Sequence, residues 1–481
     1  TDDFFRARID QMIDLRHPLA VLAQRLPWAK LEVSLAPVFA HKPKFPGGGG
    51  MDLFGPVPAG VAYVSNAGRP RLPLRLMISL LYLKHAFDLS DEELVVRWSE
   101  NIVWQYFSGM DCYEPRLPCD ATQLGRFRTA IGEAGVEELL AATIETAVEI
   151  KAIKRADLER VIVDTTVQEK AIAHPTDSRL LEKARIQLVA AAKDVGIQLK
   201  QTFAKEGKQL HWRAGRYGHA RQFRRMRRMI GRQRTIVGRL IREIGRKMPT
   251  HLDASQQARL LELLHRAQRI RDQRPRDKNK LYALHAPEVE CISKGKARKR
   301  YEFGVKTGLL STLTGGLLVG ARSFPGNPYD GHTLAEQLEQ SNILMQDLEV
   351  KIKQVSADLG YRGKAVEADN PGVDLVHRGK IKSLSRAQRR ALRRRPAVEP
   401  VIGLLKEDHG MRRCWLKGAT GDAIHAVLCA AGYNIRWLMR AVARLGLKAL
   451  YLRLILVTFI AHWVEGSATP GALIAIHGAE N

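Results

Sequence analysis

The sequence predicts an α/β protein whose strand-rich core is interrupted by a long helical insertion and preceded by an all-helical domain. Three observations favour this fold class. At Arg160 the spacing of apolar residues changes from the helical period of 3.6 to the strand period of 2, helical spacing returns over residues 176–280, and strand signals resume at Tyr301. The 481 residues, 45% of them hydrophobic, are enough for about three domains at roughly 150 residues each.

Residues 1–68 predict an N-terminal helical segment and a flexible linker, because short helical signals precede the run KPKFPGGGG. Residues 69–155 predict a compact helical domain. Within it, Ser90 with Glu93 matches a capping box, and Asp120 is expected to cap a further helix. Short helices joined by turns fit either a helix-turn-helix DNA-binding domain or a helical packing or dimerisation domain, and the pattern alone does not separate the two.

The expected core comprises residues 156–175 and 281–420, and its first strand is the run VIVDTTV that follows Arg160. Further strands are expected at Tyr301–Leu310, Leu317–Ser323, Val350–Asp358 and Val373–His377, with one helix after NPYDGHTL and another near Pro396. The order β, β, β, α, β, β, α matches a ribonuclease-H-like sheet, in which three antiparallel strands precede a crossover helix and further strands. Residues 421–481 are expected to form a C-terminal apolar helix and a tail.

Residues 176–280 interrupt this core and predict an inserted bundle or arm of three long amphipathic helices. The segment Trp212–Lys247 carries twelve arginines, whose planar guanidinium groups suit phosphates. Four of them are expected to contact a DNA backbone: Arg224, Arg225, Arg227 and Arg228. A solvated charged face is the alternative interpretation.

The overall charge is the strongest compositional signal, with 77 Lys and Arg against 50 Asp and Glu and a formal net charge of +27. So large a positive charge indicates a polyanionic partner, and nucleic acid is the first candidate. A membrane partner is disfavoured, because the most apolar stretch, Ala449–Ala461, is shorter than the roughly 20 residues of a span and carries Arg453. The five cysteines form no CxxC pair, so a reduced, cytoplasmic location is expected. The sequence contains no phosphate-binding loop of the GxxxxGK[ST] type, so a nucleotide cofactor is not expected.

Three acids fall where a metal-dependent phosphodiester reaction needs them. Asp164 lies inside an apolar strand, where a carboxylate is costly to bury unless it is paired or metal-bound. Asp358 ends a strand before a tight turn, and Glu399 opens the helix near Pro396. Two Mg²⁺ ions held by such acids can activate an attacking oxygen and stabilise a leaving oxygen. For Glu399 alone, a stabilising contact with the helix dipole is the simpler interpretation.

Basic residues flank these acids in the sequence. Arg395 lies four residues before Glu399 and Lys406 seven after, so the three share one helical face on which the cations could hold flanking phosphates. Arg362 follows Asp358 in the turn and is expected to contact DNA as well. A further pair is expected to bind DNA from the helix that Asp120 begins: Arg126 and Arg128.

The sequence resembles the DDE transposases of bacterial insertion sequences, of the insertion-sequence-five type within the combined four/five superfamily. The resemblance covers roughly residues 70–440 and rests on the runs LPLRLMISLLYL, VIVDTTVQEKAI, YEFGVKT, NPYDGHTL, ADLGYRG and VEPVIGLLKEDHGMRRCWLKG, followed by GDAIHAVLCAAGYNIRW. The superfamily signature Tyr-x2-Arg-x3-Glu-x6-Lys fits at Arg395, Glu399 and Lys406, but its first position here is Leu392.

The resemblance implies that Asp164, Asp358 and Glu399 are the catalytic triad and ligate two Mg²⁺ ions, with Mn²⁺ as a substitute. It also implies an enzyme that binds terminal inverted repeats, cuts DNA and joins the freed ends to target DNA, working as a homodimer on paired ends near the bacterial nucleoid. Two rivals are a ribonuclease-H-like nuclease without strand transfer and a domesticated DNA-binding protein. The second predicts a lost carboxylate, and all three acids are present.

Overall fold

The computed structural model describes residues 7–40, 51–52, 55–56, 71–293 and 300–467. These residues divide into two compact units, of which the first contains Thr1–Ala130, Ala141–Arg155 and Gly432–Asn481 and the second contains Ile131–Leu140 and Ala156–Ala431. The C-terminal helix α17 (Gly418–Ser467) contributes to both units, and so does the long helix α7 (Ala121–Glu149), which is interrupted by a positive φ at Gly132.

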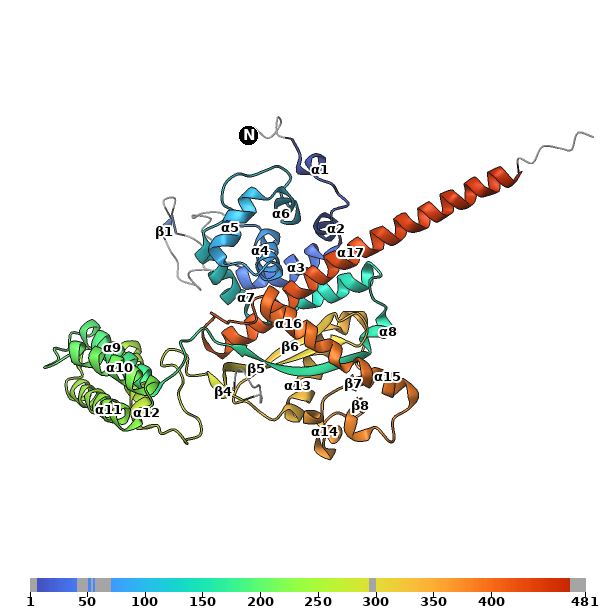
Figure 1. Ribbon diagram of the computed structural model, residues 1–481. Coiled ribbons are helices and arrows are strands. Elements are labelled where there is room, and N and C mark those ends of the chain that lie inside the picture. The colour runs from blue at the N-terminus through green and yellow to red at the C-terminus, as the bar shows by residue number, and fades with distance from the viewer. Residues whose placement is uncertain (1–6, 41–50, 53–54, 57–70, 294–299, 468–481) are drawn as a thin grey trace, which may run out of the picture. The chain divides into compact units, whose positions relative to one another are not determined.

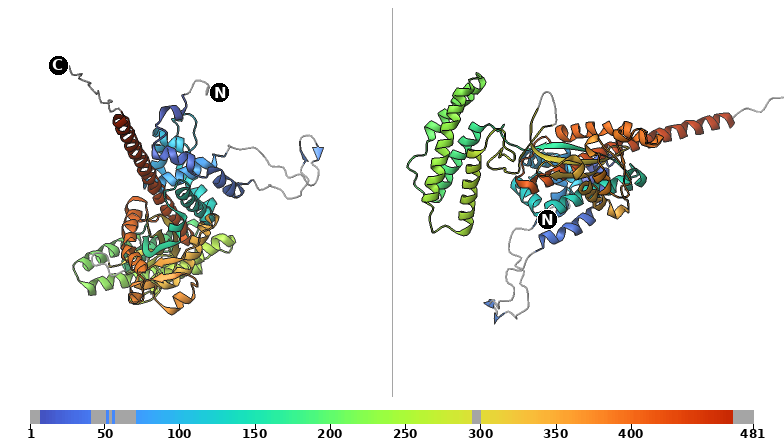
Figure 2. Two further views of the ribbon diagram at one scale, coloured as in Figure 1. Left: turned by 90° about the vertical axis from the view of Figure 1, so that its right-hand side faces the viewer. Right: turned by 90° about the horizontal axis from the view of Figure 1, so that it is seen from below.

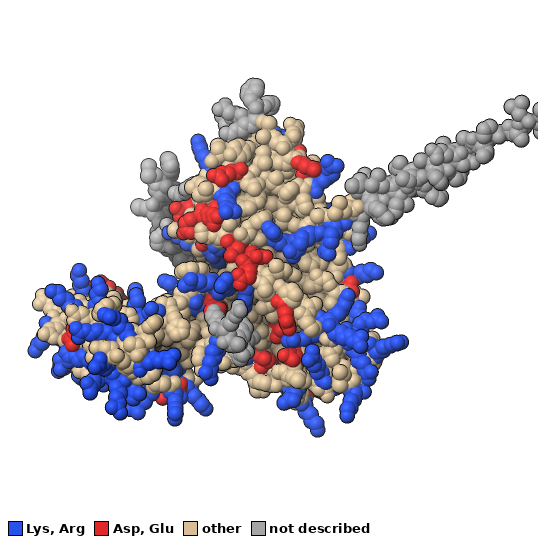
Figure 3. Space-filling model, viewed as in Figure 1, with Lys and Arg blue, Asp and Glu red and all other residues tan. Residues whose placement is uncertain are grey.

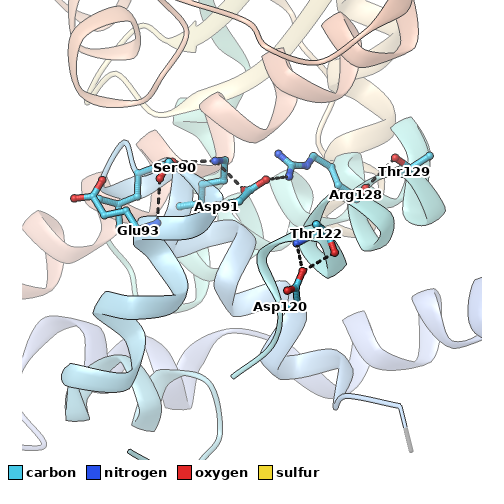
Figure 4. Close-up of polar contacts among 10 residues, drawn as sticks. Ser90, Asp91, Glu93, Asp120, Thr122, Arg128 and Thr129 are labelled. Atoms are coloured by element: carbon cyan, nitrogen blue, oxygen red, sulfur yellow. Dashed lines mark hydrogen bonds and ion pairs between the residues drawn. The ribbon is translucent and has the colours of Figure 1, made fainter. Parts of the chain in front are cut away.

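The described residues of the first unit are helical apart from one short strand pair. Its further elements are α1 (Ile9–Met12), α2 (Pro18–Arg25), α3 (Trp28–Leu35), η2 (Ala36–Phe39), β1 (Met51–Asp52), β2 (Gly55–Pro56), α4 (Leu74–Ala86), α5 (Asp91–Glu100) and α6 (Ile102–Phe107). The ring of Trp28 lies at the centre of its core, meeting Tyr82 and Phe107 edge-on at centroid distances of 6.3 and 5.3 Å. Both expected N-caps are present: the Ser90 side chain accepts a hydrogen bond from the Glu93 amide, and Asp120 accepts one from the Thr122 amide (Figure 4). Of the two, Asp120 forms the full capping box, with Gln123, whereas for Ser90 and Glu93 the reciprocal bond is not part of the cap.

The second unit is built on a six-stranded mixed sheet (Figure 1). Its strands are β3 (Arg160–Glu169), β4 (Glu290–Ile292), β5 (Glu302–Thr312), β6 (Leu318–Phe324), β7 (Gln354–Ser356) and β8 (Asp374–Val376). The central strand β3 pairs antiparallel with β5 and parallel with β7, β6 pairs antiparallel with β5, and β8 pairs parallel with β7. Strand β4, which the sequence does not predict, also pairs antiparallel with β5. Apart from β4, the strands follow the order expected from the sequence, with β3, β5 and β6 antiparallel in sequence and then β7 and β8 parallel.

The strands β3 and β5 approach each other closely at their ends. A side chain at Gly304 would place its Cβ 1.9 Å from the carbonyl oxygen of Gln168, so only glycine fits there. Most residues of β3 are buried, because it lies between β5 and β7 in the middle of the sheet. A polar side chain on this strand is consequently held in one position by its neighbours.

Short helices connect and cover the strands of the second unit. They are α8 (Arg155–Leu158), η3 (Asp330–Thr333), α13 (Leu334–Leu344), η4 (Gln346–Leu348), η5 (Leu359–Tyr361), α14 (Lys364–Ala368), η6 (Arg378–Lys380), α15 (Arg386–Arg394), η7 (Arg395–Ala397) and α16 (Val398–Asp408). Helix α13 packs against β5 and β6, whereas α16 packs against β3.

The insertion contains four helices rather than the three expected (Figure 2). These are α9 (Asp177–Asp194), α10 (Ala204–His219), α11 (Phe223–Arg246) and α12 (Ala254–Asp272). They share a core that includes Leu188, Leu240 and Ile244. Helix α10 escapes the sequence pattern because its buried positions include Gly207, Leu210 and Ala214, of which only Leu210 is a large apolar residue.

The C-terminal helix expected from the sequence is present as α17. Within the described residues, no helix combines the length and apolar character that crossing a bilayer requires.

Candidate active site

Asp164 lies in the middle of β3, and one of its oxygens is fixed by the backbone. Its Oδ1 accepts a hydrogen bond of 2.8 Å from the amide of Thr165. Successive side chains of a strand point to opposite faces. Thr165 points to the face where Asp330 accepts its hydroxyl, so Asp164 points to the other face, toward Arg395.

Asp358 and Glu399 come from neighbouring connections, and both are more exposed. The strand expected to reach Asp358 ends earlier, at Ser356, because Asp358 turns the chain into η5 by accepting a hydrogen bond of 2.7 Å from the Leu359 amide. Glu399 is the second residue of α16 and therefore lies in its first turn. The side chains of Asp358 and Glu399 remain 58% and 66% exposed, so both can reach a ligand from solvent.

A single guanidinium group contacts all three acids. Arg395 Nη2 lies 2.9 Å from Asp164 Oδ2 and 3.6 Å from Asp358 Oδ2, and its Nη1 lies 3.7 Å from Glu399 Oε1. Carboxylates gathered around one cation repel one another, and the guanidinium compensates that repulsion. Arg395 was expected to contact a phosphate, but in this structure its contacts are with the acids.

The donor set of this cluster suits a hard divalent cation. It offers only carboxylate oxygens, the ligand type that Mg²⁺ takes, and two of its three members are open to the water molecules that Mg²⁺ retains. The central position is already one at which positive charge is stabilised, as the contacts of Arg395 demonstrate. The donor chemistry therefore fits divalent metal ions. Among the described residues, however, the ligand atoms of these three acids do not all lie within 4.8 Å of one another, so bound ions would have to draw the acids closer together.

A fourth acid, Asp330, supports the cluster and was missed by the sequence reasoning. Its Oδ1 accepts from Thr165 Oγ1 at 3.1 Å and from Lys306 Nζ at 2.9 Å. Its Oδ2 lies close to Gly360, because a Cβ added at Gly360 would be only 3.0 Å from that oxygen. Asp330 thus links the strand of Asp164 to the turn of Asp358. The signal was an acid among turn residues in NPYDGHTL, but only the fold reveals its partners.

Two basic residues expected near the acids have different surroundings. Lys406 is mostly buried, and its Nζ lies 3.9 Å from Glu302 Oε1 on β5. Arg362 is exposed in the turn after η5. Of the two, Arg362 is the one whose guanidinium is open to a phosphate.

Arg128, expected to bind DNA, is instead part of the interior of the first unit. It is 4% exposed, and its Nη2 lies 2.7 Å from Asp91 Oδ2, while Lys84 Nζ lies 2.9 Å from Asp91 Oδ1 (Figure 4). Burial alone would raise the pKa of Asp91, but the two cations outweigh burial and lower that pKa. We therefore correct the expectation for Arg128, because its charge is used within the fold. Arg126 is exposed beside a cavity of about 510 Å³.

The four arginines expected on the insertion are all exposed on α11: Arg224, Arg225, Arg227 and Arg228. Figure 3 shows Lys and Arg side chains gathered over these helices. A hollow of about 350 Å³ at the turn from α10 to α11 is lined by arginines and by the aromatic residues Trp212 and Tyr217, which the sequence did not single out. There the guanidinium of Arg216 stacks over the ring of Trp212, with 4.6 Å from Cζ to the ring centroid, and Trp212 is 60% exposed.

Comparisons with known proteins identify two transposase domains in the chain. Residues 58–130 match a family described as a transposase domain (DUF772), and residues 372–439 match a family described as a transposase DDE domain. The second match includes Arg395, Glu399 and Lys406. The chain therefore belongs to the DDE transposases of insertion sequences.

A curated relative is similar over part of the chain. It is an uncharacterised protein of Rhizobium meliloti, ORF8 of the nfe locus, which is 44% identical over 222 residues. The matched region covers 46% of this chain and 95% of the relative. No solved structure matches the chain.

Proposed function

We propose that this transposase binds the terminal inverted repeats of its own element, cleaves the DNA ends and joins them to target DNA. The observation that carries the proposal is the convergence of Asp164, Asp358 and Glu399 on one guanidinium group. The acids come from three elements far apart in the sequence, so their meeting is a property of the fold. DNA is the polyanion that a chain with a formal net charge of +27 suits.

The proposed reaction assigns each acid a ligand role. Asp164, Asp358 and Glu399 would hold two Mg²⁺ ions, or Mn²⁺ as a substitute, which together activate the attacking oxygen and stabilise the leaving oxygen. The carboxylate of Asp164 is held in place, because its Oδ1 accepts a hydrogen bond from the Thr165 amide. Once Arg395 leaves the acids, its planar fork is free to hold a phosphate of the DNA beside them.

The sheet supports a ribonuclease-H-like core as part of this proposal. On one side of β3 lies β5, which pairs antiparallel with it, and on the other side lies β7, which pairs parallel with it. Asp164 is part of β3, and Asp358 follows the end of the adjacent strand β7. The insertion between β3 and β4 then corresponds to the arginine-rich segment at 176–280. We also retain as proposals the limits 1–68, 69–155 and 421–481 for the flanking parts, and membership of the insertion-sequence-five type.

The proposed DNA contacts are divided between the two units. In the first unit we propose Arg126, in the second Arg362 and Arg395, and on the insertion Arg224, Arg225, Arg227 and Arg228. Lys406 is retained as a proposed contact that would act once its ion pair with Glu302 opens. A homodimer holding two DNA ends is proposed from the resemblance, since two ends must be joined to one target.

An excision assay in cells tests the proposal without knowledge of the repeat sequences. The gene and several hundred flanking base pairs are placed on a plasmid, and excised and rejoined DNA is sequenced. Asp164→Asn, Asp358→Asn and Glu399→Gln should each abolish excision while DNA binding persists. Cleaved ends that never join to target would indicate a nuclease, and DNA binding lost to the same extent in all three variants would show that the acids are structural.

A further inference from the structure

Helix α15 presents a dense group of arginines immediately before the acid cluster. In a helix of nine residues, five arginines are exposed: Arg386, Arg389, Arg390, Arg393 and Arg394. None of the five forms an ion pair or a side-chain hydrogen bond with any residue that the structure describes. The surface they form, called here the α15 surface, lies where Figure 3 shows a second gathering of Lys and Arg side chains.

The helix contacts the rest of the unit through its cap and its opposite face. Ser385 and Gln388 form a capping box at its N-terminus, and Gln388 Nε2 donates to Asp374 Oδ2 on β8 at 2.7 Å. Ala391 is buried against the unit. Five like charges on so short a helix repel one another, so an isolated helix of this sequence would be disfavoured. Anchoring to β8 keeps the arginines together in the absence of a counter-charge.

We propose that the α15 surface binds the phosphate backbone of target DNA during strand transfer. The inference rests on the proposed function and names the surface that receives the second DNA. Arg394 is followed directly by Arg395, which contacts all three acids, so DNA on this surface runs to the reacting centre. At about 1.5 Å per residue the helix is about 13 Å long, which spans about four phosphates at an axial spacing of roughly 3.4 Å.

The composition of this surface favours target DNA over the ends of the element. Its exposed residues are arginines and Ala387, and its one amide side chain, Gln388, is engaged with Ser385 and Asp374. Contacts to phosphates carry no sequence information, whereas terminal repeats must be distinguished from other DNA by their bases. Among base edges arginine can read only guanine, so a surface of arginines without a free amide or acid suits target sites of varied sequence better than a defined terminal repeat.

The test measures binding of the full chain by fluorescence anisotropy, in EDTA and at several salt concentrations, to a random-sequence duplex and, separately, to duplexes taken from the DNA that flanks the gene on each side. In R389A/R393A the slope of log K against log salt should become shallower by about 2, because each lost phosphate contact removes about 0.9. The charge-preserving R389K/R393K should keep the slope. The control R155A/K351A removes two exposed cations elsewhere and should also keep it.

Two outcomes would overturn the inference. An unchanged slope in a folded R389A/R393A, checked by its melting temperature, would show that these arginines do not contact phosphates. A loss confined to the element's own terminal DNA would assign the α15 surface to end recognition. Because the assay contains no metal and needs no cleavage, its result is independent of whether the acid variants block excision.

Discussion

Arg395 is the residue whose contacts bear most directly on the proposed metal site. Its guanidinium occupies the position between Asp164, Asp358 and Glu399 that divalent ions would take. A cation that must be displaced competes with the metal, so its presence lowers the apparent metal affinity. After displacement, the same group is free for DNA. Metal binding and DNA binding should therefore strengthen each other.

Replacing Arg395 should separate these two effects. We expect Arg395→Gln to bind Mn²⁺ several-fold more tightly than the wild type, because the competing charge is gone, while binding DNA more weakly. Titration of Mn²⁺ followed by electron paramagnetic resonance measures the first effect, and anisotropy measures the second. Weaker Mn²⁺ binding in a folded variant would mean that Arg395 organises the acids rather than competing for them.

Asp330 acts through its neighbours and is best described as a positioning residue. It accepts from Thr165, the residue after Asp164, and from Lys306, and it lies against Gly360, two residues after Asp358. Loss of hydrogen bonds to a charged group costs about 1.5–3 kcal/mol each. Its removal should move two metal ligands relative to each other as well as reduce stability.

We therefore expect Asp330→Ala to lower excision at least tenfold and to raise the Mn²⁺ concentration at half-maximal activity. Asp330→Asn, which keeps the acceptor for Thr165, should be intermediate. Glu336→Gln is a matched control, because Glu336 pairs with Arg322 in an exposed ion pair on the following helix. If Asp330→Ala lowered only the melting temperature and left the Mn²⁺ dependence unchanged, a purely structural role would be indicated.

At the scale of elements, a buried ion cluster joins the end of β3 to the start of α17. Lys170 Nζ lies 2.8 Å from Glu288 Oε1 and 2.8 Å from Asp422 Oδ1, with all three side chains largely buried. Burial alone would lower the pKa of Lys170, but its hydrogen bonds to the two acids raise it. Burial raises the pKa of Asp422 despite the partner lysine. The charge of Lys170 therefore stabilises the ionised forms of two carboxyl groups, which burial alone would disfavour.

Removing this lysine should destabilise the second unit strongly and in a pH-dependent way. Lys170→Met leaves two buried acids without their cation, which costs about 3–5 kcal/mol near pH 7. Without the cation, burial raises the folded-state pKa of both acids, and a raised pKa favours folding at low pH. The difference from the wild type should therefore shrink as the pH falls toward about 4. Urea unfolding at pH 7 and pH 4.5 measures this, and a constant difference would contradict it.

The elements differ in how well the sequence predicts them. The strands β3, β5 and β6 follow the alternation of their apolar residues and begin within a few residues of their expected positions. Strand β7 is shorter than expected, because Asp358 begins a turn instead of ending the strand. Helix α10 was missed because two of its three buried residues, Gly207 and Ala214, are small, and Gly207 packs against the Glu182–Arg185 ion pair rather than against an apolar side chain.

At the scale of the whole molecule, the sequence named the three acids and Arg395 but assigned Arg395 to a phosphate rather than to the acids. Acids on a strand, after a strand and at a helix start are visible as a pattern, so Asp164, Asp358 and Glu399 could be proposed together. The contact of Arg395 with all three, the support from Asp330 and the burial of Arg128 depend on tertiary packing. No spacing along the chain distinguishes a buried arginine from one that is open to DNA.

The central claim is that three acids distant in the sequence form one divalent-metal site. Binding of Mn²⁺ to the purified full chain, followed by electron paramagnetic resonance, tests it most directly and needs no DNA substrate. We expect Asp164→Asn, Asp358→Asn and Glu399→Gln each to weaken Mn²⁺ binding by tenfold or more. Glu367→Gln, which alters an exposed acid paired with Lys380, should leave it unchanged. Equal Mn²⁺ binding by the wild type and all three acid variants would contradict the claim.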